Sequence, residues 1–248
     1  MHRTAVFVYG VVSYAIFFAT FLYLAGFLGN FVVPKSVDSG IVGPIGAAIL
    51  VNTLLVLVFG IQHTVMARPT FKKWLDKFVS KPAERSTYVM ATNIALIALF
   101  WLWQPMTGTI WDVQNTIGQA VLWALFGLGW LIVLVTTFLI NHFDLFGLRQ
   151  VWLYFRGVEY TAVSFRNPGP YSYVRHPLYV GWLIAMWATP SMSTGHLLFA
   201  VTNTIYILVA IYFEERNLIE FHPEYAEYRK NVPMLIPRLT IKKPNSEP

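Results

Sequence analysis

Residues 174–218 read VRHPLYVGWLIAMWATPSMSTGHLLFAVTNTIYILVAIYFEERNL and contain two apolar stretches, 177–193 and 195–213, which meet at the short sequence STG. Two apolar helices joined by so short a link form a tight helical hairpin. Arg175 and His176 stand immediately before the first stretch, and Glu214 and Glu215 follow the second. Because the two feet of a tight hairpin lie side by side, we expect these four polar residues to meet in space.

The chain as a whole is apolar, with 56% hydrophobic and 12% charged residues among its 248. A soluble domain carries about 25% charged residues, and a helix of about 20 apolar residues crosses the hydrocarbon core of a bilayer. We therefore expect an all-α, polytopic integral membrane protein with about six transmembrane helices. The expected spans are 5–29, 41–62, 87–103, 116–141, 177–193 and 195–213.

Positive charge is distributed unevenly between the two sides of the predicted membrane. If the N-terminus is cytoplasmic, seventeen of the eighteen Lys and Arg residues lie inside and only Lys35 lies outside. Such an excess is typical of cytoplasmic loops, so both termini are expected in the cytoplasm. The basic residues are spread over separate loops, which argues against a nucleic-acid-binding surface. Since the chain has no cysteine, disulfides and thiolate metal sites are excluded.

The predicted domain organisation is simple. We expect residues 1–240 to form a single membrane domain, followed by a flexible tail at 241–248. Within this domain, the N-terminal spans cover 5–103 and the second half covers 116–239.

Two polar stretches close inner helix ends in the first part of the chain. In GIQHTVMARPTFKKW, 60–74, His63 lies at the end of a span that Arg68 and Pro69 terminate. In FLINHFDLFGLRQVW, 138–152, His142 and Asp144 close the fourth span. These residues either line a cavity or simply satisfy the interface with snorkelling side chains. A direct pair of His142 with Asp144 is disfavoured while the helix continues, because residues two apart do not share a helix face.

Two further stretches flank the hairpin. In SFRNPGPYSYVRHPLYVGW, 164–182, the Asn-Pro-Gly-Pro sequence predicts a rigid loop, and Pro177 suits the first turn of the next helix. That helix start favours an anion, and Gly181 permits close approach of a ligand or a helix. In YFEERNLIEFHPEYAEYRKNVPMLIPRL, 212–239, the adjacent Glu214 and Glu215 need a cation or hydroxyl donors. Residues 218–230 are typical of a helix lying on the membrane surface.

The two feet together offer a basic group, two carboxylates and several aromatic rings. Such a set suits a zwitterionic ligand that carries hydroxyls, a flat ring and a cation. S-adenosylmethionine is one such ligand, although this chemistry does not single it out.

A resemblance narrows the choice. The sequences RHPLYVG and EE, followed by EFHPEYAEYRKNVPMLIP, resemble the C-terminal half of the isoprenylcysteine carboxyl methyltransferase and phospholipid methyltransferase superfamily. FGIQHTVMARPTFKKW and NHFDLFGLRQVWL resemble its nurim-like branch. The resemblance implies a bacterial inner-membrane S-methyltransferase that converts methanethiol to dimethyl sulfide. It implies S-adenosylmethionine as the methyl donor and neither a metal, a nucleic acid nor an obligate protein partner.

The resemblance also implies positions for the site. Carried over residue by residue, its pattern gives these cofactor-binding positions: Tyr171, Tyr173, Arg175, His176, Tyr179, Gly181, Glu214 and Glu215. The attacking species should be a thiolate, and a free thiol has a pKa of about 8.5 or higher, so a base should assist. Our candidates for a catalytic base are His142 with Asp144, and His63.

Three other functions remain open at this point. A methyltransferase for a phospholipid, an isoprenylcysteine carboxylate or another small thiol would share the cofactor motif. A structural nurim-like membrane protein would not need the complete Arg-His-Pro and Glu-Glu set. A transporter would favour charges or broken helices at mid-membrane, whereas here the polar residues cluster at inner helix ends.

Overall fold

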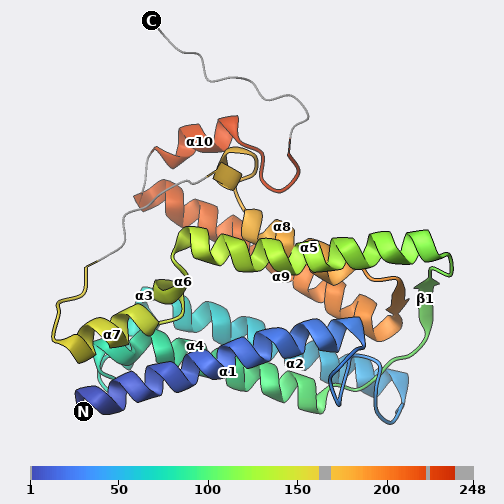
Figure 1. Ribbon diagram of the computed structural model, residues 1–248, viewed down its shortest axis with the longest axis horizontal. Helices are drawn as coiled ribbons and strands as arrows, with labels where there is room; N and C mark the ends of the chain where they lie inside the picture. The colour runs from blue at the N-terminus through green and yellow to red at the C-terminus, as the bar shows by residue number, and fades with distance from the viewer. Residues whose placement is uncertain (1, 162–168, 222–223, 238–248) are drawn as a thin grey trace, which may run out of the picture.

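Figure 1 shows the computed structural model, which describes residues 2–161, 169–221 and 224–237. Within these residues, five helices are long and apolar enough to cross a membrane. They are α1 (Arg3–Gly29), α2 (Ile45–Ala67), α4 (Glu84–Leu102), α5 (Thr116–Ile140) and α9 (Thr194–Phe221). The predicted all-α, polytopic membrane fold is confirmed. The expected tail at 241–248 and most of the lead-in loop, 162–168, lie outside the described residues.

The fifth expected span is shorter than predicted. Helix α8 (Pro177–Trp187) has 11 residues, which is about 16 Å of helix and therefore about half of a bilayer core. Pro190 contributes to this early end because a proline disfavours helical backbone in the residue before it. Strand β2 (Ser191–Ser193) then pairs antiparallel with β1 (Thr109–Asp112), with Trp111 opposite Met192. The hairpin is thus a half-length helix, a short strand and the full-length α9.

Helices α5 and α8 pack backbone to backbone through two glycines. A Cβ atom added to Gly129 would lie 2.5 Å from the Ala185 nitrogen, and one added to Gly181 would lie 2.8 Å from the Val133 nitrogen. Small residues allow helices in a membrane to approach this closely. The approach therefore fixes where the first turn of α8, with its polar lead-in, stands relative to the end of α5.

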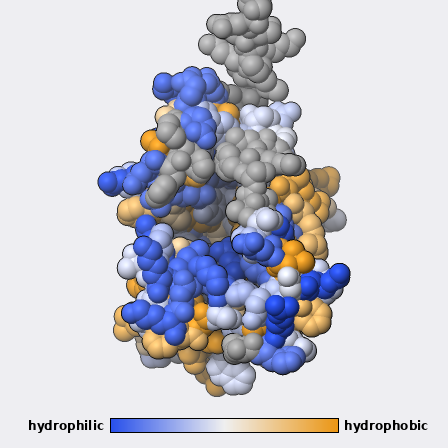
Figure 2. Space-filling model, turned by 90° about the vertical axis from the view of Figure 1, so that its left-hand side faces the viewer, coloured by the Kyte–Doolittle hydropathy of each residue, from blue (hydrophilic) through white to orange (hydrophobic). Residues whose placement is uncertain are grey.

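Short helices gather at the end of the long ones that the charge distribution predicts to be cytoplasmic. They are α3 (Pro69–Leu75), η1 (Lys81–Ala83), α6 (His142–Leu145) and α7 (Leu148–Arg156), while η2 (Gly169–Ser172) and α10 (Tyr225–Asn231) lie near the end of α9 (Figure 1). The predicted end of α2 is confirmed, since it stops at Ala67 and Pro69 begins α3. Figure 2 views this end, where hydrophilic residues gather while hydrophobic residues cover the flanks.

Candidate active site

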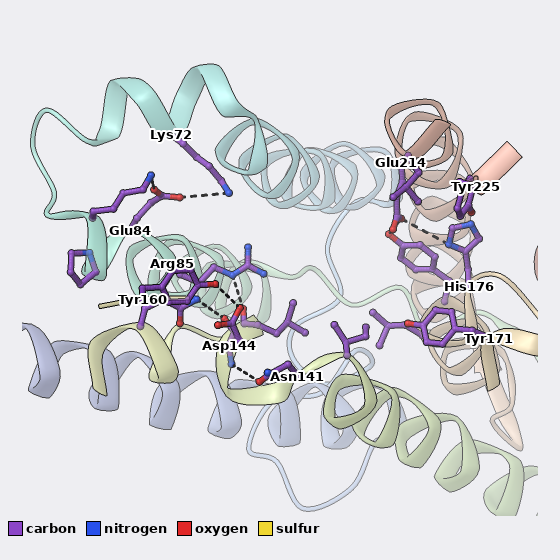
Figure 3. A pocket seen from close by; sticks show the side chains of 18 of the residues that line it. Lys72, Glu84, Arg85, Asn141, Asp144, Tyr160, Tyr171, His176, Glu214 and Tyr225 are labelled. Carbon is purple, nitrogen blue, oxygen red and sulfur yellow. Dashed lines mark hydrogen bonds and ion pairs between the residues drawn. The ribbon is translucent and has the colours of Figure 1, made fainter. Parts of the chain in front are cut away.

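A cavity of about 1040 Å³ opens at the hydrophilic end of the molecule that Figure 2 views. Residues of α3, η1, α4, α6, α7 and the segment 158–160 form one side, here termed the N-terminal wall. Residues of η2, α8, α9 and α10 form the other side, the C-terminal wall. Figure 3 shows Asp144, Arg85 and Glu84 facing His176, Glu214 and Tyr171 across the space.

Glu215 is the centre of the C-terminal wall. Its Oε1 accepts hydrogen bonds from Arg175 Nε at 2.6 Å and from His176 Nε2 at 3.0 Å. Its Oε2 lies 3.2 Å from Arg229 Nε. Glu215 is 4% exposed, so these partners replace water around a buried carboxylate. The prediction that the two feet of the hairpin meet is confirmed.

Arg175 is held more completely than its sequence position suggested. Besides Glu215, its Nη1 donates to the carbonyl oxygens of Arg229 and Val232, and its backbone nitrogen donates to the Pro233 carbonyl at 2.9 Å. The Arg175 side chain is 9% exposed. Its charge is already matched by a buried carboxylate, so it is a poor receptor for the carboxylate of a ligand.

Glu214, by contrast, faces the cavity. Its side chain is 46% exposed, and its Oε2 accepts a hydrogen bond from the Tyr179 hydroxyl at 3.1 Å. His176 Nδ1 lies 4.0 Å from the same oxygen. Glu214 therefore keeps acceptor capacity for hydroxyls or a cation inside the cavity.

Of the remaining predicted cofactor-binding positions, one lines the cavity and two do not. Tyr171 lines the cavity, and burial raises the pKa of its phenol to about 12, so the group stays neutral. Tyr173 is 55% exposed and does not line the cavity. Gly181 lies against α5 and serves helix packing. Two residues of α10, Tyr225 and Tyr228, complete the wall, so the segment predicted to lie on the membrane surface also lines the cavity.

The N-terminal wall carries a second polar cluster around Asp144. Arg149 Nη1 donates to Asp144 Oδ1 at 3.0 Å, and the Tyr160 hydroxyl donates to Oδ2 at 3.2 Å. Asn141, at the end of α5, accepts a hydrogen bond from the Asp144 backbone nitrogen at 3.3 Å. Of the three predicted catalytic residues, Asp144 is the one that the structure brings to the cavity.

His142 lies behind this wall. Its ring is 2% exposed and stacks on Phe138, with centroids 4.1 Å apart. Nδ1 lies 2.7 Å from the Thr137 hydroxyl, and Nε2 lies 2.8 Å from the Tyr14 hydroxyl. Burial lowers the pKa of His142, which favours a neutral imidazole. Its two hydrogen bonds join the end of α5 to α1, while Asp144 pairs with Arg149 instead, in line with the expectation that a direct pair of His142 with Asp144 is disfavoured.

His63 also lies outside the cavity lining. Its Nε2 is 2.7 Å from the Tyr88 hydroxyl, and its ring stacks on Phe59 with centroids 5.5 Å apart. The hydrogen bond with Tyr88 joins α2 to α4. The sequence did not identify the lining residues Lys72, Glu84 and Arg85. The two basic residues were attributed to membrane topology alone, and Glu84 lies in none of the motifs.

Comparisons with known proteins identify the relatives of this chain. Residues 130–220 match the isoprenylcysteine carboxyl methyltransferase (ICMT) family, a segment that includes the second half of α5, all of α8 and nearly all of α9. Nurim from Sus scrofa is 28% identical over 173 residues, which cover 66% of this chain and 65% of that protein. No solved structure matches the chain.

Two bacterial relatives cover nearly the whole sequence. Methanethiol S-methyltransferase from Crocosphaera subtropica is 52% identical over 96% of this chain and 93% of its own length. Methanethiol S-methyltransferase 2 from Bradyrhizobium diazoefficiens is 54% identical over 97% of this chain and 93% of its own length. The resemblance seen in the motifs is confirmed, and the chain belongs to the methanethiol S-methyltransferase family.

Proposed function

We propose that this protein transfers a methyl group from S-adenosylmethionine to methanethiol, with dimethyl sulfide and S-adenosylhomocysteine as products. The observation that carries the proposal is the cavity between the two walls, in a chain about half identical to methanethiol S-methyltransferases along almost its whole length. We place the reaction at the cytoplasmic face of a bacterial inner membrane, because the cavity opens at the end that is rich in basic residues.

The residues around the cavity fit the methyl donor. Sites for small molecules and cofactors have volumes of about 300–1,000 Å³, and this cavity, at about 1040 Å³, has room for a nucleoside with an amino-acid side chain. Glu214 offers a carboxylate to ribose hydroxyls, and Tyr171 and Tyr179 offer aromatic faces to adenine or to a sulfonium. In this proposal the buried cluster of Arg175, His176 and Arg229 around Glu215 does not touch the ligand. It fixes the positions of Tyr179 and Glu214, which do.

The chemistry asks little of side chains beyond placement. S-adenosylmethionine supplies an activated methyl group, and the thiolate must approach it in line at about 3–3.5 Å. The new carbon–sulfur bond forms as the methyl–sulfonium bond breaks, and the thiol proton passes to a base or to water. Asp144 is our candidate for the proton acceptor at the wall. Because a free thiol is mostly protonated at neutral pH, a positive field must also lower the thiol pKa.

His142 and His63 support the site from behind in this proposal. His142 holds the end of α5, from which Asn141 and Asp144 follow. His63 holds α4, which carries Arg85. The proposal therefore gives both histidines positioning roles. The alternative, that one of them is the catalytic base, stays a prediction from the sequence.

The proposal is tested by incubating purified protein with methyl-labelled S-adenosylmethionine and, separately, methanethiol, a phospholipid and a prenylcysteine. We expect labelled dimethyl sulfide with methanethiol, and a strong loss of it in the Glu214→Gln variant. Label in the lipid or the prenylcysteine would support the alternative methyltransferases, and label in no product would support a non-enzymatic protein.

A further inference from the structure

The four Lys and Arg side chains that line the cavity in the described part of the chain differ in how they are paired. Lys72 Nζ lies 3.6 Å from Glu84 Oε1, and Lys81 contacts both Glu84 and Asp76. Arg175, in the C-terminal wall, forms an ion pair with Glu215. Arg85 alone, among these four, has no carboxylate within ion-pair distance in the described residues.

Arg85 is nevertheless fixed in place. Its Nε donates to the Leu145 carbonyl of α6 at 2.6 Å. Its guanidinium lies over the Tyr88 ring, 4.9 Å from the centroid. These contacts use one N–H and one face of the group, so the outer nitrogens, Nη1 and Nη2, keep their donors. Half-buried and oriented from two elements, the side chain forms a preorganised fork.

A planar guanidinium fork matches a carboxylate better than any other common anion on a small metabolite except phosphate. S-adenosylmethionine carries a carboxylate and no phosphate. Figure 3 shows Arg85 on the opposite side of the cavity from Glu214, His176 and Tyr171. The C-terminal wall, where Glu214 offers acceptors and Tyr171 an aromatic face, suits hydroxyls and a flat ring instead.

We infer that Arg85 binds the α-carboxylate of the methyl donor, while the C-terminal wall binds its adenosine. The inference rests on the proposed function for the identity of the ligand. In this arrangement the two ends of the donor bind to opposite walls, and its sulfonium lies in the space between them. Asp144 and Asn141 also line this cavity. It also gives Arg85, which sequence reasoning assigned to topology, a specific ligand contact.

The test is calorimetry with two nucleosides, S-adenosylhomocysteine, which has the carboxylate, and 5′-methylthioadenosine, which lacks the whole amino-acid end. Arg85→Gln should weaken S-adenosylhomocysteine roughly 10- to 100-fold, the range of a charge-assisted pair, and leave 5′-methylthioadenosine unchanged. Arg85→Lys, which keeps the charge without the fork, should give an intermediate loss. Lys81→Gln is the matched control, because Lys81 lines the same cavity but is already paired, and it should not change the ratio of the two affinities.

The outcomes separate the two proposals. If Arg85→Gln weakens both nucleosides equally, Arg85 is structural, and if it weakens neither, it does not touch the ligand; each result overturns the inference. A selective loss in a protein that yields no dimethyl sulfide would keep the Arg85 assignment and reject methanethiol as the substrate. Wild-type protein that binds neither nucleoside would overturn the inference and the proposed donor together. Melting temperatures of the variants in detergent identify any that do not fold.

Discussion

The two walls of the cavity are built from similar residues and in opposite ways. In the C-terminal wall, one buried carboxylate, Glu215, gathers Arg175, His176 and Arg229 around itself. In the N-terminal wall, the acids and bases form smaller, partly exposed pairs, and Arg85 keeps its outer nitrogens for a ligand. The C-terminal wall is built on a closed, buried cluster, with Glu214 and Tyr179 at its edge facing the cavity. The N-terminal wall is an open polar surface.

The neighbours Glu214 and Glu215 show the same contrast within two residues. Consecutive residues of an α-helix point about 100° apart, so one carboxylate of an adjacent pair can be buried while the other faces a cavity. Glu215 turns toward Arg175 and His176, immediately before α8, whereas Glu214 turns toward Tyr179, in the first turn of α8, and toward the open space. A pair that looks like a single motif in the sequence therefore has two separate tasks.

Removing the centre of the closed wall should have the largest effect. Glu215→Ala leaves two arginines and a histidine without their shared carboxylate, and loss of one partner of a buried ion pair costs about 3–5 kcal/mol of unfolding free energy. The melting temperature in detergent should fall steeply, and binding of S-adenosylhomocysteine should be lost. An unchanged melting temperature would show that the cluster on Glu215 does not hold the wall together.

The next effect concerns the packing that positions the closed wall. Gly129→Ala places a Cβ atom 2.5 Å from the Ala185 backbone nitrogen, so α8 must move away from α5, and overpacking of this kind costs about 1–3 kcal/mol. Gly127→Ala, on the same helix, is the matched control, because its Cβ atom would meet nothing within 4 Å. Equal melting temperatures for the two variants would contradict the close approach of these helices.

Glu214→Gln should distinguish the cavity-facing Glu214, which we expect to affect ligand affinity, from the buried cluster around Glu215, which we expect to affect stability. The variant keeps the shape of the side chain and removes the charge that accepts from Tyr179, so we expect roughly a tenfold loss of S-adenosylhomocysteine affinity, or about 1.4 kcal/mol. The melting temperature should remain near that of the wild type, since the side chain is half exposed. A large thermal loss with intact affinity would reverse the roles of the two glutamates.

The smallest expected effect is a missing titration. Burial lowers the pKa of His142, so its imidazole takes up a proton only below the ordinary value of about 6.5 and is neutral at higher pH. The logarithm of kcat/KM for methanethiol should therefore rise with pH as the thiol ionises, without a further inflection between pH 6.5 and 8. His142→Ala should lower turnover more than donor affinity, because it loosens the end of α5. A wild-type inflection in that window that His142→Gln removes would restore His142 as the base.

These contrasts also show what the sequence could predict. The apolar stretches, the stop at Pro69, the start at Pro177 and the meeting of the hairpin feet follow from local patterns and short connections. The strand after α8 does not, because Ser191–Ser193 becomes a strand through pairing with residues about eighty positions earlier. An apolar run cannot reveal such a partner.

The N-terminal wall was harder to predict for a different reason. Its residues come from five helices and the segment 158–160, so no compact motif marks them. A basic residue in an inner loop satisfies the positive-inside rule whether or not it faces a ligand. Arg85 was therefore explained by membrane topology, and nothing in the sequence indicated that it lines the cavity. His142 misled in the opposite direction, since a buried histidine that joins two helices has the same sequence context as a catalytic one.

The most direct test of the central claim, that one donor molecule fills the space between the two walls, uses the absence of cysteine from the chain. Single cysteines replace Leu145 on the N-terminal wall or Leu218 on the C-terminal wall, both of which line the cavity, and Ile41, which is 91% exposed elsewhere, is the control site. The rate of alkylation by a small thiol reagent is measured with and without S-adenosylhomocysteine. We predict slower labelling at both Leu145→Cys and Leu218→Cys and no change at Ile41→Cys. Protection of one wall alone, or of neither, would contradict the account.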